Sequence, residues 1–421
     1  MTDTTDWRTI ADTYGTPAYI YDGGLLEGRI ADTRRALHPA LDIFFSLKSN
    51  PNPAVLALLH AGGAKAEVCS LAELRIARSV GVAVDDIIFL GPGKSAAELT
   101  ACVREGIYAV VCESLQELDR LDAVAAEHGV RQRVMLRVNP AFSVSGSRLT
   151  MGGKPRQFGI DEEVVLGETG LAGRHPHLDI AGVHVYSGTR ILDADVVVKN
   201  TEYTLDLAER VAAKLGISLD VVDFGGGLGV PYFDGEHELD LEALALALNP
   251  LLDKFRAAHP TTRLIMESGR YLTADAGTYL MEVRYTKESM GEPFAVTDGG
   301  THHHMAAVGI GSFVKRNFPI DLLGRDATGE GRRPWTITGP LCTPNDTVGK
   351  KVDLPELRPG DLLGVRRSGA YGPSASPVLF LSHGHPAEVL LTGEGSRLLR
   401  ARDTTDDLLA PYLSADDTTT N

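Results

Sequence analysis

The stretch of sequence that decides the fold is residues 41–91, LDIFFSLKSNPNPAVLALLHAGGAKAEVCSLAELRIARSVGVAVDDIIFLG. It contains three short runs rich in aliphatic residues, Leu41–Lys48, Ala66–Ser70 and Ile87–Gly91, with the length and composition of buried strands. Between the second and third runs, the apolar residues of Leu71–Val80 recur with the spacing of an amphipathic helix. This alternation predicts parallel strands joined by crossover helices.

The alternation continues as far as residue 271. Further strands are predicted at Tyr108–Ser114, Arg133–Pro140, Ile180–Gly188, Leu219–Gly227 and Arg263–Tyr271. Further helices are predicted at Ala96–Glu105, Leu115–His128, Ala194–Leu215 and Leu241–Ala258. Eight such strands within about 230 residues match an α/β fold of the closed (β/α)8 type, with a doubly wound open sheet as the alternative.

The pattern changes after Leu272. Short strands separated by Gly, Pro and Asp follow, without helical stretches, at Thr278–Thr286, Pro293–Asp298, Pro334–Gly339, Leu362–Val365 and Ala387–Leu391. We therefore expect a barrel over residues 25–277 and an all-β domain formed by residues 1–24, which include the early run Pro17–Asp22, plus residues 278–400. The tail, residues 401–421, is rich in Asp and Thr, and its composition predicts flexibility.

Composition excludes several classes of protein. The chain has 421 residues, 41 Lys and Arg, 56 Asp and Glu, a net charge of −15 and 43% apolar residues, which is sufficient for a large core. An acidic chain without blocks of Lys or Arg is not typical of nucleic-acid binding, and no apolar run approaches the length of a membrane span. Its acidic, polar first residues resemble no targeting signal, so we expect a cytoplasmic protein with neither nucleic-acid nor membrane partners.

The cysteines and histidines predict no metal site. The four cysteines, Cys69, Cys102, Cys112 and Cys342, form no CxxC pair, and the simplest interpretation of each is a buried thiol in a reducing compartment. The run of three histidines at residues 302–304 would point in alternating directions, and no HxxxH accompanies it. We expect one of them, His303, to line a substrate pocket instead.

Chemistry in such a barrel lies at the C-terminal ends of the strands, and the first predicted strand ends in Lys48. A lysine there is either a surface residue that extends into solvent or an amine held in the mouth of the barrel. In the second case, desolvation lowers the pKa of the amine and suits it to Schiff-base chemistry.

The last two predicted barrel strands end in Gly225-Gly226-Gly227 and in Glu267-Ser268-Gly269-Arg270. Loops after strands 7 and 8 are the usual phosphate site of this barrel, and an arginine there would add a charge-assisted contact. The alternative is that these residues are turn glycines and a structural ion pair. Together with a lysine at the same mouth, the two motifs favour a site for a phosphorylated ligand.

Seven motifs together resemble those of the fold-type III pyridoxal-phosphate decarboxylases, the family that contains diaminopimelate and ornithine decarboxylases. They are FSLKSN (45–50), LRVNP (136–140), QFGI (157–160), DFGGGLG (223–229), ESGR (267–270), GPLC (339–342) and GAYG (369–372). The resemblance extends from Tyr14 to about Leu391. It implies an alanine-racemase-like (β/α)8 barrel followed by a β-domain, pyridoxal 5'-phosphate as cofactor, and a homodimer with shared active sites.

The resemblance also implies roles for individual residues. Lys48 would bind the cofactor covalently, Tyr186 would face its ring, and Glu267 would contact its pyridine nitrogen. Cys342, supplied across the dimer interface, would return a proton to Cα. The phosphate would be held by Gly225, Gly226, Gly227, Gly269 and Arg270, with Tyr371 contributed by the partner subunit.

Two departures from the family pattern concern the ring and the substrate. Tyr186 replaces the second His of a His-x-His strand, which keeps an aromatic face but removes a titratable nitrogen. Thr343 replaces an acidic residue that follows the cysteine in diaminopimelate and ornithine enzymes and helps hold the distal amine of their substrates. Without that charge, discrimination in favour of a distal ammonium should weaken.

Four further motifs are most similar to a biosynthetic subgroup that includes the butirosin-pathway glutamyl-carrier-protein decarboxylase. They are MGGK (151–154), HVYSGT (184–189), DGGTHHH (298–304) and LCTP (341–344). We therefore expect an amino-acid α-decarboxylase of specialised metabolism whose substrate lacks a simple distal ammonium and is a glutamyl or other carrier-tethered amino acid. Expected substrate contacts are Thr343, Arg316 with its neighbour Lys315, Asp298 and His303.

Three alternatives remain open at the level of sequence. Diaminopimelate decarboxylase of lysine biosynthesis has the same motifs. An amino-acid racemase shares the barrel and cofactor, but places Arg rather than Glu against the pyridine nitrogen, so Glu267 argues against it. A non-catalytic pyridoxal-phosphate carrier would lack the β-domain, and the presence of Cys342 and Tyr371 argues against that class.

Overall fold

The computed structural model describes residues 5–141, 149–150, 155–308 and 316–416. The chain divides into two compact units. Unit 1 comprises Met1–Leu26, Tyr232–Gly235 and Thr273–Asn421, and unit 2 comprises Glu27–Pro231 and Glu236–Leu272.

Unit 2 is a closed parallel barrel. Its strands are β2 (Leu41–Ser46), β3 (Lys65–Val68), β4 (Ile87–Phe89), β5 (Ala109–Cys112), β6 (Gln132–Asn139), β9 (Leu178–His184), β11 (Val221–Asp223) and β12 (Arg263–Ser268). Neighbouring strands in this order pair in parallel, and β12 pairs with β2, which closes the circle. The predicted barrel is confirmed, and the open sheet is excluded.

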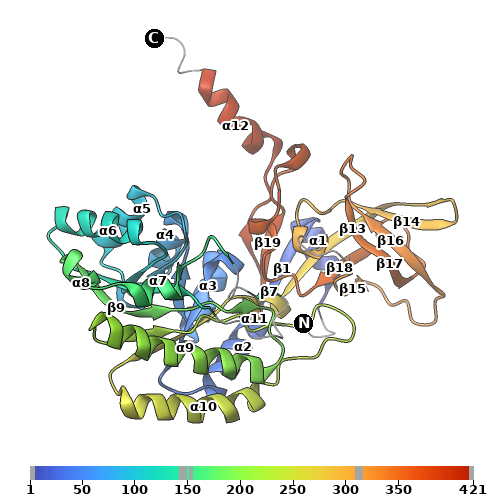
Figure 1. Cartoon of the computed structure of the whole chain (residues 1–421). Coiled ribbons are helices and arrows are strands. Elements are labelled where there is room, and N and C mark those ends of the chain that lie inside the picture. The colour runs from blue at the N-terminus through green and yellow to red at the C-terminus, as the bar shows by residue number, and fades with distance from the viewer. Residues whose placement is uncertain (1–4, 142–148, 151–154, 309–315, 417–421) are drawn as a thin grey trace. The chain divides into compact units, whose positions relative to one another are not determined.

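Helices lie on the outside of these strands (Figure 1). They are α2 (Gly23–Ala36), α3 (Pro53–Ala61), α4 (Leu71–Val80), α5 (Ala96–Glu105), α6 (Leu115–Glu127), α7 (Glu162–Gly167), α8 (Leu171–Arg174), α9 (Ala194–Leu215), α10 (Leu241–Ala258) and α11 (Arg270–Thr273). Ser70, Ser95 and Ser114 each cap a helix by accepting a hydrogen bond from the backbone N–H three residues later. These caps fix the residue at which each of the three helices begins.

The remaining elements of unit 2 are short, and its strands enclose an apolar core. The short elements are η1 (Leu47–Ser49), η2 (Val84–Asp86), β7 (Leu149–Thr150), β8 (Ile160–Asp161) and β10 (Gly188–Thr189). The core contains Phe44, Ile88, Met135, Val221 and Ile265, all at most 1% exposed. Polar groups at the strand ends are therefore mounted on a rigid apolar base.

Unit 1 is built on strands that pair both antiparallel and parallel. They are β1 (Ala18–Asp22), β13 (Gly277–Ser289), β14 (Glu292–Thr297), β15 (Ile320–Leu323), β16 (Arg332–Thr338), β17 (Thr347–Pro355), β18 (Leu362–Arg366), β19 (Ala387–Thr392) and β20 (Gly395–Arg400). β1 lies between β13 and β19, antiparallel to the first and parallel to the second. Unit 1 also contains α1 (Trp7–Tyr14), η3 (Ala274–Ala276), η4 (Met305–Val308), η5 (Pro373–Ala375) and η6 (Phe380–Ser382).

Part of the tail is helical. Residues Thr405–Asp416 form helix α12, which projects at the C-terminal end of the chain (Figure 1). Asp407 accepts hydrogen bonds from the backbone N–H and the hydroxyl of Thr404, and the Asp407 N–H donates to the Thr404 hydroxyl. This reciprocal cap starts a helix that composition alone does not predict. Among the described residues, no helix is both long and apolar enough to cross a membrane.

Candidate active site

Lys48 lies in η1, directly after β2. Its Nζ donates to Oε1 of Glu67 at 2.8 Å, and the lysine side chain is 38% exposed whereas that of Glu67 is fully buried. Glu67 reaches Lys48 because β3 pairs in parallel with β2, with Glu67 opposite Ser46. The ion pair therefore holds the amine at the C-terminal end of the barrel, where a ligand can reach it.

Glu67 was missed in the sequence analysis. A lone carboxylate inside the apolar run Ala66–Ser70 is the signal that points to it, because glutamate is almost never fully buried without a partner. The Cys69 thiol donates to the same oxygen at 3.2 Å. Burial, reinforced by the charge of Glu67, raises the pKa of Cys69 far above its ordinary value, so this thiol stays protonated.

Three ionisable side chains converge at the ends of β9, β11 and β12. Nε2 of His184 and Oε1 of Glu267 are 3.1 Å apart, with the two side chains 0% and 2% exposed. Asp223 stands opposite His184 in the strand register, and its Oδ1 accepts the backbone N–H of Gly225 at 2.8 Å. The sequence analysis included Glu267 in the site but assigned no role to His184 or Asp223.

The two carboxyl groups of this cluster have pKa values displaced in opposite directions. Burial alone would raise the pKa of Glu267, but the charge and hydrogen bond of His184, with the charges of Lys48 and Arg137, lower it to about 2. Burial and the charge of Glu267 raise the pKa of Asp223 well above its ordinary value. One carboxyl group is therefore ionised and its neighbour protonated, the usual outcome when two acids share a dry site.

The glycines after β11 form a turn that tolerates no side chain. A Cβ on Gly226 would lie 1.7 Å from the carbonyl oxygen of Glu267. Gly227 has φ of +92°, and a Cβ there would lie 2.1 Å from the carbonyl oxygen of Gly188. A turn of this kind lets a ligand phosphate approach the backbone closely. A Cβ on Gly269, beside Arg270 at the start of α11, would lie 2.8 Å from the hydroxyl of Ser49.

Tyr186 completes this group. A Cβ on Gly225 would meet Cδ2 of Tyr186 at 3.0 Å, so the tyrosine ring lies against the glycine turn. Burial raises the pKa of Tyr186, and the charges of Lys48, Glu267 and Arg270 all act on it. Lys48, Tyr186, the glycine turn, Glu267 and Arg270 are thus brought together in unit 2.

The site fits pyridoxal phosphate. Oε2 of Glu267 and Oδ2 of Asp223 are buried and have no hydrogen-bond partner among the described residues. Unsatisfied buried carboxylate oxygens are costly, and a protonated pyridine nitrogen is a donor that would satisfy one of them. The glycine turn offers N–H groups for the phosphate, and Lys48 offers an amine for the aldehyde.

The same cluster has the composition of a metal site. Ligand atoms of His184, Asp223 and Glu267 lie within 4.8 Å of one another, and all three residues are buried. However, Nε2 of His184 and Oε1 of Glu267 already form a hydrogen bond with each other, which uses two of the atoms that a cation would need. The cluster suits a cofactor nitrogen better than a cation.

Unit 1 carries the other residues implied by the resemblance. Cys342 is exposed, in contrast to the buried thiols of Cys102 and Cys112. It lies in the turn after β16, where Asp346 accepts hydrogen bonds from the backbone N–H groups of Leu341 and Thr301, each at 2.8 Å. Thr343, half-buried, and Tyr371, with φ of +56°, also lie in this unit. An exposed thiol on a braced turn is available to a reacting group.

Two of the expected substrate contacts have other partners in the structure. His303 is buried, and its ring nitrogens bond the hydroxyl of Tyr279 and the carbonyl of Gly384. Asp298, 8% exposed, accepts the Thr16 hydroxyl and the Glu282 N–H. In this arrangement these polar atoms make contacts within unit 1. Arg316 is exposed, whereas Lys315 and the MGGK motif (151–154) lie outside the described residues.

Comparison with known proteins identifies similar sequences over the whole chain. A family model described as "Pyridoxal-dependent decarboxylase, pyridoxal binding domain" matches residues 24–274. The chain is 38% identical to the L-glutamyl-[BtrI acyl-carrier protein] decarboxylase of Niallia circulans, covering 98% of this chain and 97% of that protein. It is 30% identical to the diaminopimelate decarboxylase of Aquifex aeolicus, covering 96% and 94%.

The fold is similar to that of solved structures as well. The crystal structure of diaminopimelate decarboxylase from Helicobacter pylori complexed with L-lysine superposes with a TM-score of 0.87 at 26% identity, covering 97% of this chain and 100% of that one. Both units therefore have counterparts in a single solved chain.

Proposed function

Because the chain belongs to the pyridoxal-dependent decarboxylases and is a decarboxylase that uses pyridoxal phosphate, we propose that its substrate is a glutamyl group, or a similar amino acid without a distal ammonium, held by a carrier protein. The observation that carries this proposal is the full-length identity of 38% to a glutamyl-carrier-protein decarboxylase. Thr343 supports it, because a neutral residue beside Cys342 offers no charge for a distal amine.

The residues of the barrel have the following proposed roles. Bound pyridoxal phosphate supplies an electron sink for the electron pair released when the Cα–carboxylate bond breaks. Lys48 holds the cofactor covalently, and the ionised Glu267, kept so by His184, holds a proton on the pyridine nitrogen. The glycine turn at residues 225–227 and Arg270 bind the phosphate. Tyr186 would present its aromatic face to the cofactor ring and would exclude water from that side.

The residues of unit 1 complete the reaction. We propose that Cys342 donates the proton that replaces the lost carboxylate at Cα, and that Tyr371 adds a hydrogen bond to the phosphate. In this proposal the chain forms a homodimer in which each active site takes Lys48 from one subunit and Cys342 with Tyr371 from the other. A thiol is a suitable donor because its exposure leaves it free to move toward the reacting carbon.

The test is a substrate panel with release of carbon dioxide as the readout. We expect the holoenzyme to decarboxylate a glutamyl thioester of a carrier protein and to be at least about tenfold less efficient, in kcat/KM, on meso-diaminopimelate. Lys48→Ala serves as the control, because it loses the amine that binds the cofactor. High activity on meso-diaminopimelate with none on glutamyl thioesters would instead assign the chain to diaminopimelate decarboxylation. The same assay also tests for a metal. If His184, Asp223 and Glu267 hold no metal, an added chelator should leave the release of carbon dioxide unchanged.

A further inference from the structure

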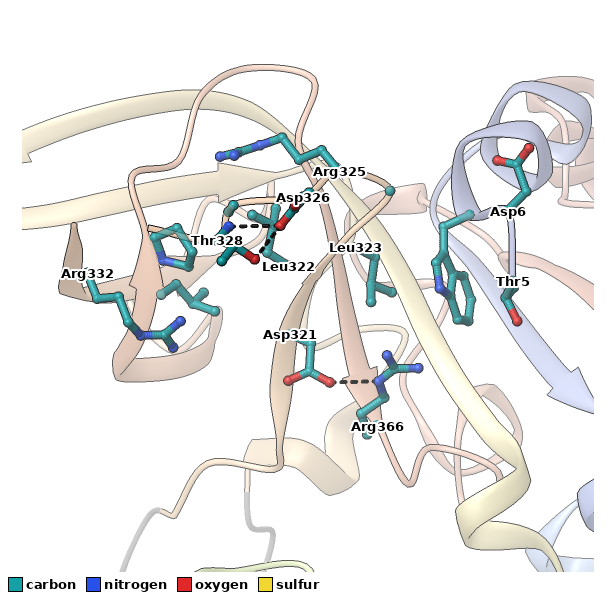
Figure 2. A pocket seen from close by; sticks show the side chains of 15 residues that line it. Thr5, Asp6, Asp321, Leu322, Leu323, Arg325, Asp326, Thr328, Arg332 and Arg366 are labelled. Carbon is teal, nitrogen blue, oxygen red and sulfur yellow. Dashed lines mark hydrogen bonds and ion pairs between the residues drawn. The ribbon is translucent and has the colours of Figure 1, made fainter. Parts of the chain in front are cut away.

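Unit 1 contains a cavity of about 730 Å³ whose charged groups already have partners (Figure 2). Arg366 bonds Asp321 at 2.8 Å, and the Asp326 carboxylate accepts the hydroxyl and N–H of Thr328. The other charged residues that line it bond elsewhere: Asp6 caps α1, Arg325 pairs with Asp361, and Arg332 pairs with Asp353. No charge in this cavity is left for a ligand.

A second cavity of unit 1 has a volume of about 680 Å³, and it is lined by charged side chains without such partners in the ranges that the structure describes. Its lining includes three exposed cations, Arg316, Lys350 and Lys351, and one carboxylate, Asp234. Within the part of the chain that the structure describes, none of these three cationic side chains makes a hydrogen bond or ion pair. We call this cavity the basic pocket. The basic pocket is thus lined by three cations and one carboxylate in a chain whose net charge is −15.

A β-bulge directs both lysines into the basic pocket. Trp335 pairs with Val352 and Ile337 pairs with Gly349, so two residues of β17, Lys350 and Lys351, stand opposite a single residue of β16. Neighbouring side chains of a regular strand would point to opposite faces, and a bulge removes that alternation. Lys351 has φ of +55°, an unusual conformation for a residue with a long side chain.

Other contacts fix this arrangement. The Asn317 side chain donates to the carbonyl of Lys350 at 2.7 Å and accepts its N–H at 2.9 Å, which holds the bulge. The guanidinium carbon of Arg316 lies 5.7 Å from the centre of the Phe233 ring. An aromatic face orients a guanidinium without neutralising its charge. The cations are therefore positioned, although no carboxylate pairs with them.

The basic pocket adjoins the turn that carries the exposed thiol. Pro344 lines the pocket, and Cys342 lies two residues earlier on the turn that Asp346 braces. A ligand with an anionic group in the pocket would thus be held beside the loop of the proposed proton donor.

We propose that the basic pocket binds the phosphodiester of the arm through which a carrier protein holds its substrate. Carrier proteins attach their acyl groups as thioesters at the end of a phosphopantetheine arm, so a phosphate lies at a fixed chain length from the reacting amino acid. Two lysines on a bulge and an arginine from another segment suit a phosphate, and the volume exceeds what a single small anion fills. This inference rests on the proposed function and extends it from the reacting group to the arm.

The first test measures binding alone, with free phosphopantetheine as the probe and the holoenzyme in calorimetry. Lys350→Gln/Lys351→Gln should raise its Kd about tenfold or more, because two charge-assisted contacts are lost. The matched control, Lys287→Gln/Arg397→Gln, removes the same charge from exposed positions of unit 1 outside the pocket and should leave Kd unchanged. Equal binding by wild type and pocket variant would overturn the proposal, as would binding of inorganic phosphate as tight as that of phosphopantetheine.

The second test measures turnover with two thioesters of the same amino acid, one on the carrier protein and one on a short arm without phosphate. The pocket variant should raise KM for the carrier substrate about tenfold, with kcat and the short-arm KM unchanged. An equal loss on both thioesters would indicate a general structural role and contradict the assignment. If neither thioester reacts in the wild type, the proposed function fails, and the binding test still decides whether the pocket holds a phosphorylated arm.

Discussion

Glu267 is the residue that we propose to hold a proton on the cofactor nitrogen. Its carboxylate is buried, yet His184, Lys48 and Arg137 lower its pKa from 4.5 to about 2. The carboxylate is therefore ionised throughout the working pH range. Because the pKa is lowered on folding, the stability this ionisation contributes is present above pH 4.5 and is lost as the pH falls toward 2.

The substitution Glu267→Gln tests this role. The amide keeps the size of the side chain but cannot hold a proton on the pyridine nitrogen, so kcat should fall by about 10²-fold or more while the cofactor stays bound. Carbon dioxide release gives kcat, and visible absorbance gives the cofactor content per subunit. Glu105→Gln, which changes an exposed glutamate paired with Arg78, is the control. A kcat within about twofold of wild type would remove Glu267 from the mechanism.

For single residues, the sequence predicts those that belong to motifs but not the side chains that contact them. Lys48, Glu267 and the glycine turn are predicted because each stands at the end of a strand, where the fold exposes it. Glu67 meets Lys48 from the neighbouring strand, and His184 meets Glu267 from two strands away, and local periodicity does not report which side chains meet there. His303 shows the converse, because a titratable residue near a motif is used for packing in unit 1.

At the scale of elements, the loop from β11 to Leu228 is the part of the barrel with the least freedom. The substitution Gly226→Ala would place a Cβ 1.7 Å from the carbonyl of Glu267, so the backbone must shift where the phosphate is expected. We expect the Kd for pyridoxal phosphate to rise about tenfold or more. Gly173→Ala, where a Cβ meets nothing within 4 Å, is the matched control.

Cofactor titration of the apoprotein measures that effect, and the thermal midpoint separates it from general unfolding. If Gly226→Ala does not fold, Arg270→Gln tests the same phosphate site by removing its charge, with a similar expected loss of affinity. Wild-type affinity in either folded variant would show that the phosphate binds elsewhere.

One element that was not predicted from the sequence has a clear physical reason. The barrel strands and helices are locally periodic, and several predicted helices, such as Leu71–Val80, match the structure at both ends. β17 was not predicted because the bulge at Lys350 and Lys351 interrupts its alternation. The bulge that hides this strand from periodicity is the same feature that forms the basic pocket.

At the scale of the whole molecule, the order in which strands pair could not be predicted from the sequence. β1, at residues 18–22, pairs with β19, at residues 387–391, and no local pattern encodes a contact between segments so far apart in the chain. Residues 1–24 were expected in the β-domain because of the early strand-like run, and β1 pairs with β13 and β19 within unit 1.

Lys48 lies in unit 2 and Cys342 lies in unit 1. Whether one active site takes these two residues from different subunits can be tested with a heterodimer. If each active site combines Lys48 of one subunit with Cys342 of the other, a heterodimer of Lys48→Ala and Cys342→Ala subunits contains one site with both defects and one intact site. Co-expression with two different affinity tags yields that heterodimer, and its activity should be about half that of the wild-type dimer.

Each parent homodimer should be nearly inactive, which provides the control. If the sites are formed within one subunit, every site in the heterodimer carries one defect, and carbon dioxide release should stay at the level of the parents. Failure to recover any doubly tagged species would contradict the dimer itself. A half-active heterodimer therefore requires both that the chain dimerises and that its sites are shared, because no arrangement with self-contained sites gives an intact one.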